Sequence, residues 1–115
     1  METDNIFKSD TMSQAILAQL KGLRATGKHC DFTLRVAKRE FKAHKVVLAA
    51  SCEYFKLMLD TDTIESRENQ VEIKDVDPET MESILDFIYL GEVNITADNV
   101  QSLEAARKML GTFPP

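Results

Sequence analysis

The hydrophobic residues between Met12 and Gly27 recur at helical spacing and predict the first helix of the chain. Steps of three or four residues place them on one face of an α-helix, which we call the apolar stripe. The stripe consists of Met12, Ile16, Leu17, Leu20 and Leu23. A polar residue among residues 9–11 can cap this helix, and Gly27 lies just beyond its end. A face this apolar either packs on the rest of the domain or binds a partner, and the spacing leaves both alternatives open.

An alternation of apolar and polar side chains follows and predicts a β-hairpin. Every second residue from Cys30 to Val36 is apolar, which is the period of a half-buried strand. Residues 37–39 are the predicted turn, and residues 40–42 begin the returning strand.

The rest of the chain predicts four more helices and two short strands. Asp77 can cap the clearest of these helices, Pro78 suits its first position, and Gly91 stops it. The predicted segments are a buried helix at 46–50, a short helix at 53–59, a polar connection at 60–70, a strand at 71–73, the capped helix at 78–90, a strand at 93–95 and a final helix at 96–110. This order of elements predicts a small, helix-rich domain with a few strands.

Composition and charge narrow the class of protein. The 115 residues suit one domain, and 43% hydrophobic with 29% charged residues favours a packed core over disorder. The net charge of -5 argues against nucleic-acid binding, and no apolar run approaches the roughly 20 residues of a membrane span. No secretory signal precedes the first predicted helix, and the two cysteines fit a reducing compartment. We therefore expect a cytoplasmic or nuclear protein that binds neither nucleic acid nor a membrane.

The histidines and cysteines are the residues that could carry catalysis or bind a metal. Structural zinc sites show close ligand pairs, whereas His29–Cys30, His44 and Cys52 are separated in the sequence. A Cys–His nucleophile pair can still meet in space, but no nucleophile-elbow sequence accompanies it, and cysteines in apolar patterns are commonly core residues. We predict no enzyme activity, no catalytic residue, no metal site and no cofactor.

Positive charge gathers on the predicted hairpin, and one aliphatic residue stands alone in the polar connection. The basic residues of the hairpin have a single aromatic neighbour, Phe41, which favours a solvated face over a nucleic-acid site. Ile64 either anchors a protein partner or is tucked under its own loop, and the sequence leaves both alternatives open.

Ordered motifs in this sequence resemble the BTB (POZ) domain and, within it, the kelch-like branch. The clearest motifs are Cys30–Val36, Phe41–Ser51 and Tyr54–Phe55, and the resemblance extends from about Met12 to Leu110. It implies an α+β fold of about five to six helices flanked by a small, mainly three-stranded sheet, arranged as a two-fold homodimer.

The resemblance also divides the chain and gives the apolar stripe a role. It implies a flexible segment at 1–11, a BTB domain at 12–110 and a tail at 111–115. The leading helix of BTB domains packs against its symmetry mate, so the apolar stripe becomes the candidate dimer interface. The resemblance further implies that Asp31 and Lys45 meet near the dimer axis as a partly buried charge pair, with Lys45 where many members carry arginine.

Kelch-like BTB domains recruit the cullin-3 scaffold, while a separate domain holds the ubiquitylation substrate. Their cullin-facing surface includes a hydrophobic-x-Glu motif, which aligns with residues 63–65. Glu65 matches this motif, Thr63 replaces the hydrophobic residue, and Ile64 is an aliphatic residue one position later. The resemblance therefore implies cullin binding that is either weakened or rescued by Ile64. The candidate cullin-binding residues are Tyr54, Leu57, Thr63, Ile64 and Glu65.

The function that the resemblance implies is that of a homodimerisation module in a kelch-like substrate adaptor for cullin-3 RING ubiquitin ligases. The final helix departs from the family pattern, because Glu104 rather than a second leucine follows Leu103. We expect these 115 residues to lack the helical extension and the substrate-recognition domain of adaptors. The alternative is a BTB dimerisation module that recruits a corepressor or a cytoskeletal partner, or a short form that competes with full-length adaptors.

Overall fold

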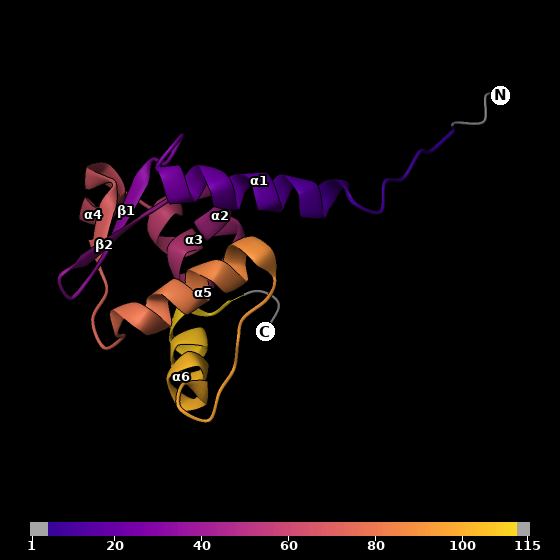
Figure 1. The fold of residues 1–115 in the computed structure, drawn as a ribbon. Coiled ribbons are helices and arrows are strands. Elements are labelled where there is room, and N and C mark those ends of the chain that lie inside the picture. Colours follow the sequence, from indigo (N-terminus) through magenta and orange to yellow (C-terminus); the bar gives the residue numbers. More distant parts are fainter. Residues whose placement is uncertain (1–4, 113–115) are drawn as a thin grey trace.

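The computed structural model describes residues 5–112 of the chain. This part contains six helices and three strands. In chain order the elements are α1 (Met12–Thr26), β1 (Phe32–Val36), β2 (Arg39–Ala43), α2 (Lys45–Ser51), α3 (Glu53–Asp60), α4 (Ile64–Glu68), β3 (Gln70–Glu72), α5 (Pro78–Leu90) and α6 (Val100–Leu110). Figure 1 shows α1 along one side of a cluster of helices, with the sheet at one end of that cluster. The expected α+β fold, helices flanked by a three-stranded sheet, is confirmed.

The three strands form a mixed sheet in the order β2-β1-β3. The predicted hairpin is present, since β1 and β2 are antiparallel and Leu34 lies opposite Phe41. Strand β3 runs parallel to β1, with Val71 opposite Leu34. The alternating residues Phe32, Leu34 and Val36 are buried, as the period of two predicts. The central strand β1 therefore presents one face of the sheet to the helices.

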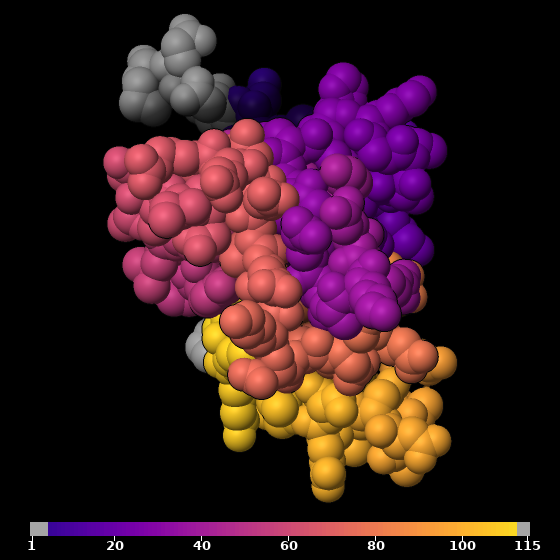
Figure 2. Space-filling model, turned by 90° about the vertical axis from the view of Figure 1, so that its left-hand side faces the viewer, coloured from indigo at the N-terminus to yellow at the C-terminus, as the bar shows by residue number. Residues whose placement is uncertain are grey.

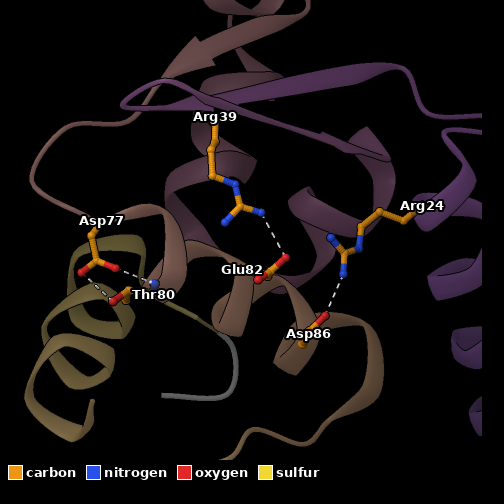
Figure 3. Close-up of polar contacts among 6 residues, drawn as sticks. All are labelled: Arg24, Arg39, Asp77, Thr80, Glu82 and Asp86. Carbon is orange, nitrogen blue, oxygen red and sulfur yellow. Dashed lines mark hydrogen bonds and ion pairs between the residues drawn. The ribbon is translucent and has the colours of Figure 1, made fainter. Parts of the chain in front are cut away.

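Helix α5 lies at the centre of the helical cluster. Its residues Met81, Leu85 and Tyr89 are fully buried, and α1, α2 and α6 all pack against it. The side chain of Asp77 accepts a hydrogen bond from the backbone N–H of Thr80 at 2.8 Å, which is the cap that the sequence predicts (Figure 3). The positions of the surrounding helices therefore depend on α5.

Near the C-terminal end, one predicted element is wrong and another begins later than predicted. The strand predicted at 93–95 is absent, because no strand within residues 5–112 pairs with this segment. The final helix begins at Val100 rather than at residue 96. The N–H of Thr96 donates to the side-chain oxygen of Asn99 at 2.7 Å, and the N–H of Asn99 donates to the hydroxyl of Thr96 at 3.2 Å. These reciprocal bonds have the pattern of a capping box, and the N–H of Val100 bonds back to the carbonyl of Thr96 at 3.1 Å, so residues 96–99 form a capping turn that leads into α6.

Two further segments differ from their predictions. The helix predicted as buried at 46–50 is α2, but Leu48 is its single buried residue, because this short helix lies at the surface with one face inward. The polar connection predicted at 60–70 contains α4, which periodicity misses because the helix is five residues long and has one aliphatic side chain.

The described end of the chain returns to the helical cluster. Gly111 ends α6 with a φ of 63°, in the left-handed region that favours glycine. Its carbonyl accepts a hydrogen bond from the N–H of Glu53, at 2.8 Å, and Thr112 beyond it is buried. The segments predicted at 1–11 and 111–115 fall partly outside the described residues.

Candidate interaction surfaces

The apolar stripe of α1 is divided between two environments. Met12 and Ile16, in the first half of the helix, are 57% and 51% exposed. Leu17, Leu20 and Leu23 are partly buried, and Leu20 packs against the core. No residue of α1 is fully buried. The two alternatives that the spacing leaves open therefore apply to different halves of the stripe, one packed on the domain and one exposed.

Arg24 joins the second half of α1 to α5 through an ion pair. Nη2 of Arg24 lies 2.8 Å from Oδ1 of Asp86 (Figure 3). The guanidinium carbon lies 5.1 Å from the centroid of the Tyr89 ring, which is within the range of a cation–π contact. Sequence reasoning missed Arg24, because Asp86 is 62 residues away and no local pattern joins them.

Asp31 and Lys45 lie together at the start of α2. The Asp31 carboxylate accepts a hydrogen bond from the backbone N–H of Lys45 at 2.7 Å, where the positive end of a helix favours a negative charge. Within residues 5–112, no ion pair joins the two side chains. The structure therefore brings the two residues together through the backbone, and a side-chain charge pair at a dimer axis stays a prediction.

Val46 is an exposed residue that sequence reasoning missed. Its side chain is 74% exposed on the outer face of α2. The unbroken apolar run at 46–50 has no period, so it does not distinguish the outer face from the inner one. Two residues along a helix are about 200° apart around its axis, so Val46 lies on the opposite side from the buried Leu48. This angle could have predicted which of the two is exposed.

Three exposed apolar residues on α3 and α4 form a second surface. We call Tyr54, Leu57 and Ile64 the α3–α4 surface. Leu57 is 55% exposed and Ile64 is 61% exposed, whereas Phe55 and Met58 face the core. Figure 2 shows the α3–α4 segment, in pink, on one side of this face, separated from the purple hairpin by the segment around β3. Ile64 therefore faces solvent and is not tucked under its loop.

Thr63 has a structural role at the start of α4. Its hydroxyl accepts a hydrogen bond from the backbone N–H of Ser66 at 3.0 Å and donates to the carbonyl of Met58 at 3.3 Å. The residue is half-buried and is the N-cap of the helix. The hydroxyl at this position is therefore used to begin α4, and the exposed aliphatic side chain comes one residue later, at Ile64.

Glu65 lies beside the α3–α4 surface, in the first turn of α4. Burial raises the pKa of the Tyr54 phenol, and the negative charge of Glu65 raises it further. Tyr54 is therefore uncharged at neutral pH and lies within electrostatic range of Glu65. Glu65 and Ile64 also line a groove that reaches Arg35 on β1. The structure thus brings the five candidate cullin-binding residues into one region.

One Cys–His pair that is separated in the sequence meets in the structure. Sγ of Cys30 lies 3.7 Å from Nε2 of His44, whose Nδ1 lies 2.8 Å from the hydroxyl of Tyr89. Burial raises the pKa of the Cys30 thiol, and the charge of Asp31 raises it further. The thiol is therefore not held as the thiolate that nucleophilic catalysis needs.

Residues 5–112 contain neither a cluster of metal ligands nor a helix that could span a membrane. Within residues 5–112, no group of three or more His, Cys, Asp or Glu side chains is placed to hold a metal ion. No helix in that part of the chain is both long enough and apolar enough to span a membrane.

A sequence model of the BTB/POZ domain matches residues 20–112. This chain belongs to the BTB/POZ domain family. The match covers the second part of α1 and every later helix and strand. The resemblance predicted from the motifs is confirmed.

Kelch-like proteins are among the curated relatives of this BTB domain. It is 42% identical over 74 residues to Kelch-like protein 7 of Rattus norvegicus, Mus musculus and Homo sapiens, a match that covers 64% of this chain and 13% of each relative. It is 39% identical over 88 residues to Kelch-like protein 17 of Mus musculus, which covers 76% of this chain and 14% of the relative. The matches thus span 13–14% of the length of these relatives.

A solved structure shares the fold of this BTB domain. The BTB domain of zebrafish PATZ1 is 31% identical, with a TM-score of 0.82 over 93% of this chain and 86% of that one. The family, the kelch-like relatives and the exposed apolar surfaces are consistent with a protein-interaction module.

Proposed function

We propose that this BTB domain is the homodimerising module of a kelch-like substrate adaptor and that it recruits the cullin-3 N-terminal domain. The single observation that carries the proposal is the exposure of Leu57 and Ile64 on two neighbouring helices. Leu57 stands where the resemblance to kelch-like proteins implies a cullin contact, and Ile64 stands one residue after the position of the hydrophobic contact. Large aliphatic side chains of this kind are effective anchors, because a protein partner removes them from water.

The exposed half of the apolar stripe supports dimerisation. Met12 and Ile16 project from a part of α1 that does not pack on the core. A two-fold contact brings the same face of a second copy against them, so one apolar stripe covers the other. Dimerisation would thus remove from water the half of the stripe that the domain itself leaves exposed.

The position of Ile64 supports cullin recruitment despite the change at Thr63. A missing apolar anchor at an interface centre commonly costs about 2 kcal/mol of binding energy. Ile64 follows Thr63 directly and faces solvent, so a partner helix shifted by one position along the loop would meet an aliphatic side chain.

Sedimentation equilibrium with and without the cullin-3 N-terminal domain tests both parts of the proposal. We expect a dimer alone and one bound cullin fragment per protomer in the mixture. A chain that sediments as a monomer contradicts dimerisation, whereas a dimer whose mass does not change contradicts recruitment. The variant Leu57→Asp should lose the cullin fragment and keep the dimer, because Leu57 lies on α3 and outside the stripe.

Thr63 favours a second candidate function, a BTB dimer that recruits a partner other than cullin-3. Its hydroxyl caps α4 where the resemblance calls for a hydrophobic residue. Such a module would recruit a corepressor or a cytoskeletal protein, or compete with full-length adaptors. A pull-down with the cullin-3 fragment beside a panel of corepressor peptides separates the two functions. For either function we place the module in the cytoplasm or the nucleus, where its free Cys30 and Cys52 stay reduced.

A further inference from the structure

The direction in which α1 projects is set near its C-terminal end. The helix has no fully buried residue, and its contact with the core is made by Leu20 in its second half. We propose that Arg24 is a positioning residue for dimerisation and that its contacts with Asp86 and Tyr89 fix the direction of the apolar stripe. This inference rests on the proposed homodimer and adds the residue that sets the geometry of its interface.

The length of α1 makes its direction sensitive to the contacts of Arg24. Met12 precedes Arg24 by 12 residues, which is about 18 Å along an α-helix. A tilt of about 10° at Arg24 would therefore move Met12 by about 3 Å. A displacement of this size separates apolar side chains that need to interlock across a two-fold contact.

The surroundings of Arg24 cover most of its side chain and supply two partners for its charge. The side chain is 12% exposed, and its Nε is buried without a hydrogen-bond partner among the described residues. The ion pair with Asp86 and the ring of Tyr89 are the contacts that compensate for removing this charge from water. If α1 tilted, the guanidinium would lose both contacts or move out to solvent. The native direction of α1 is thus the one in which the guanidinium of Arg24 keeps both Asp86 and Tyr89 as partners.

Arg39 provides a control of the same chemistry at a more exposed site, because its side chain is 47% exposed and that of Arg24 is 12% exposed. Arg39 on β2 pairs with Glu82 on α5 at 3.2 Å, and its guanidinium lies 4.7 Å from the centroid of the Phe41 ring. Figure 3 shows that Arg24 and Arg39 both reach α5, from different elements. The two arginines have the same kind of partners, but Arg39 does not belong to α1. Loss of Arg39 therefore removes an arginine contact with α5 without changing any contact of α1.

The test compares the dimer dissociation constants of Arg24→Gln and Arg39→Gln, measured by sedimentation equilibrium below the melting temperature. We expect Arg24→Gln to raise the constant about tenfold or more and Arg39→Gln to change it less than about twofold. Arg24→Lys should fall between wild type and Arg24→Gln, because lysine keeps the charge and loses the planar fork. Equal constants for Arg24→Gln and wild type would overturn the inference. If Arg24→Gln does not fold, Asp86→Asn and Arg24→Lys provide the same comparison.

Leu103→Val separates positioning from general loss of stability. This variant truncates a buried side chain of α6 and leaves Arg24, Asp86 and Tyr89 in place, so we expect a lower melting temperature with an unchanged dimer dissociation constant. A dimer weakened by Leu103→Val as much as by Arg24→Gln would show that stability alone explains the effect and would overturn the inference. A wild-type chain that is monomeric contradicts the proposed homodimer. A wild-type dimer that tolerates Arg24→Gln contradicts only the role of Arg24.

Discussion

The apolar stripe lies on a helix without a fully buried residue, whereas the α3–α4 surface begins on a helix whose other face is in the core. Phe55 and Met58 hold α3 in place from the inside, and the N–H of Glu53 is bonded to the end of α6. The stripe has no such support along its first half, where Met12 and Ile16 are exposed. The fold therefore preforms the α3–α4 surface, while the direction of the stripe depends on a few contacts of α1.

This difference separates the two kinds of binding that we propose. Binding through the α3–α4 surface should depend on which side chains are present, because their backbone is fixed. Binding through the stripe should depend on side chains and also on the direction of α1. Substitutions on one surface should therefore leave the other intact, and the first two predictions below test that separation, while the last two test the fold that holds the surfaces.

The largest expected effect is that of a charge placed in the apolar stripe. Ile16→Asp would bury an unpaired carboxylate in the dimer, and we expect the dimer dissociation constant to rise about 100-fold or more. The domain should stay folded, because Ile16 is exposed in the single chain. Sedimentation equilibrium measures the effect. Ala18→Asp, on the opposite side of α1, is the control, and a full-strength Ile16→Asp dimer would remove the stripe from the interface.

The second effect concerns the anchor on α4. Ile64→Ala should weaken binding of the cullin-3 N-terminal domain about thirtyfold, which corresponds to about 2 kcal/mol, and leave the dimer unchanged. Calorimetry measures the affinity. Thr63→Met should bring no gain, because it removes a helix cap worth about 1 kcal/mol. Unchanged affinity for Ile64→Ala would exclude α4 from the cullin interface.

A smaller effect is expected at the start of α2. Asp31→Ala removes the acceptor of the Lys45 N–H and should lower the free energy of unfolding by about 1 kcal/mol. Asp31→Asn keeps an acceptor oxygen and should cost less. Urea unfolding measures both variants. An equal loss for the two substitutions would mean that the charge of Asp31, rather than its hydrogen bond, stabilises the fold.

The smallest effect tests the cap of α5, the helix at the centre of the helical cluster. Hydrogen bonds from the backbone and side chain of Thr80 hold the pKa of Asp77 below its ordinary value of 3.8. Since the folded pKa is the lower one, this carboxylate contributes its full stability above pH 3.8 and loses it as the pH falls through the lowered pKa. Asp77→Asn should flatten the acid side of the stability curve in urea unfolding at a series of pH values. An unchanged curve would mean that other carboxylates determine the acid sensitivity.

Elements with a clear period could be predicted from the sequence. The alternation in β1 and the capped pattern after Asp77 identify both an element and its buried face. The alternation of Val93 and Ile95 does not produce a strand, because period two defines the faces of a strand and not the neighbour that it needs. The exposure of Val46 could not be predicted from the sequence for a related reason, because an apolar run without a period does not define an outer face.

The candidate surfaces follow from the sequence only in part. Helical spacing predicts the members of the stripe, but it does not show that Leu20 packs inward while Ile16 stays outside. The alignment of Thr63 with a hydrophobic position shows a departure, and only the cap geometry explains it. Arg24 could not be recognised, because its partner Asp86 is distant in the sequence and the value of the pair depends on burial.

The parallel pairing of β1 with β3 has a consequence for the order in which this domain folds during synthesis. Leu34 meets Val71, so their contact closes a loop that holds the hairpin turn, α2, α3 and α4. Closing a long loop costs chain entropy before its contacts form, and such non-local pairings form late in folding. Helix α4 packs on β3, so we expect the α3–α4 surface to be complete only after β3 has been made and has paired with β1. A partner that recognises this surface would therefore bind the folded domain and not the nascent chain.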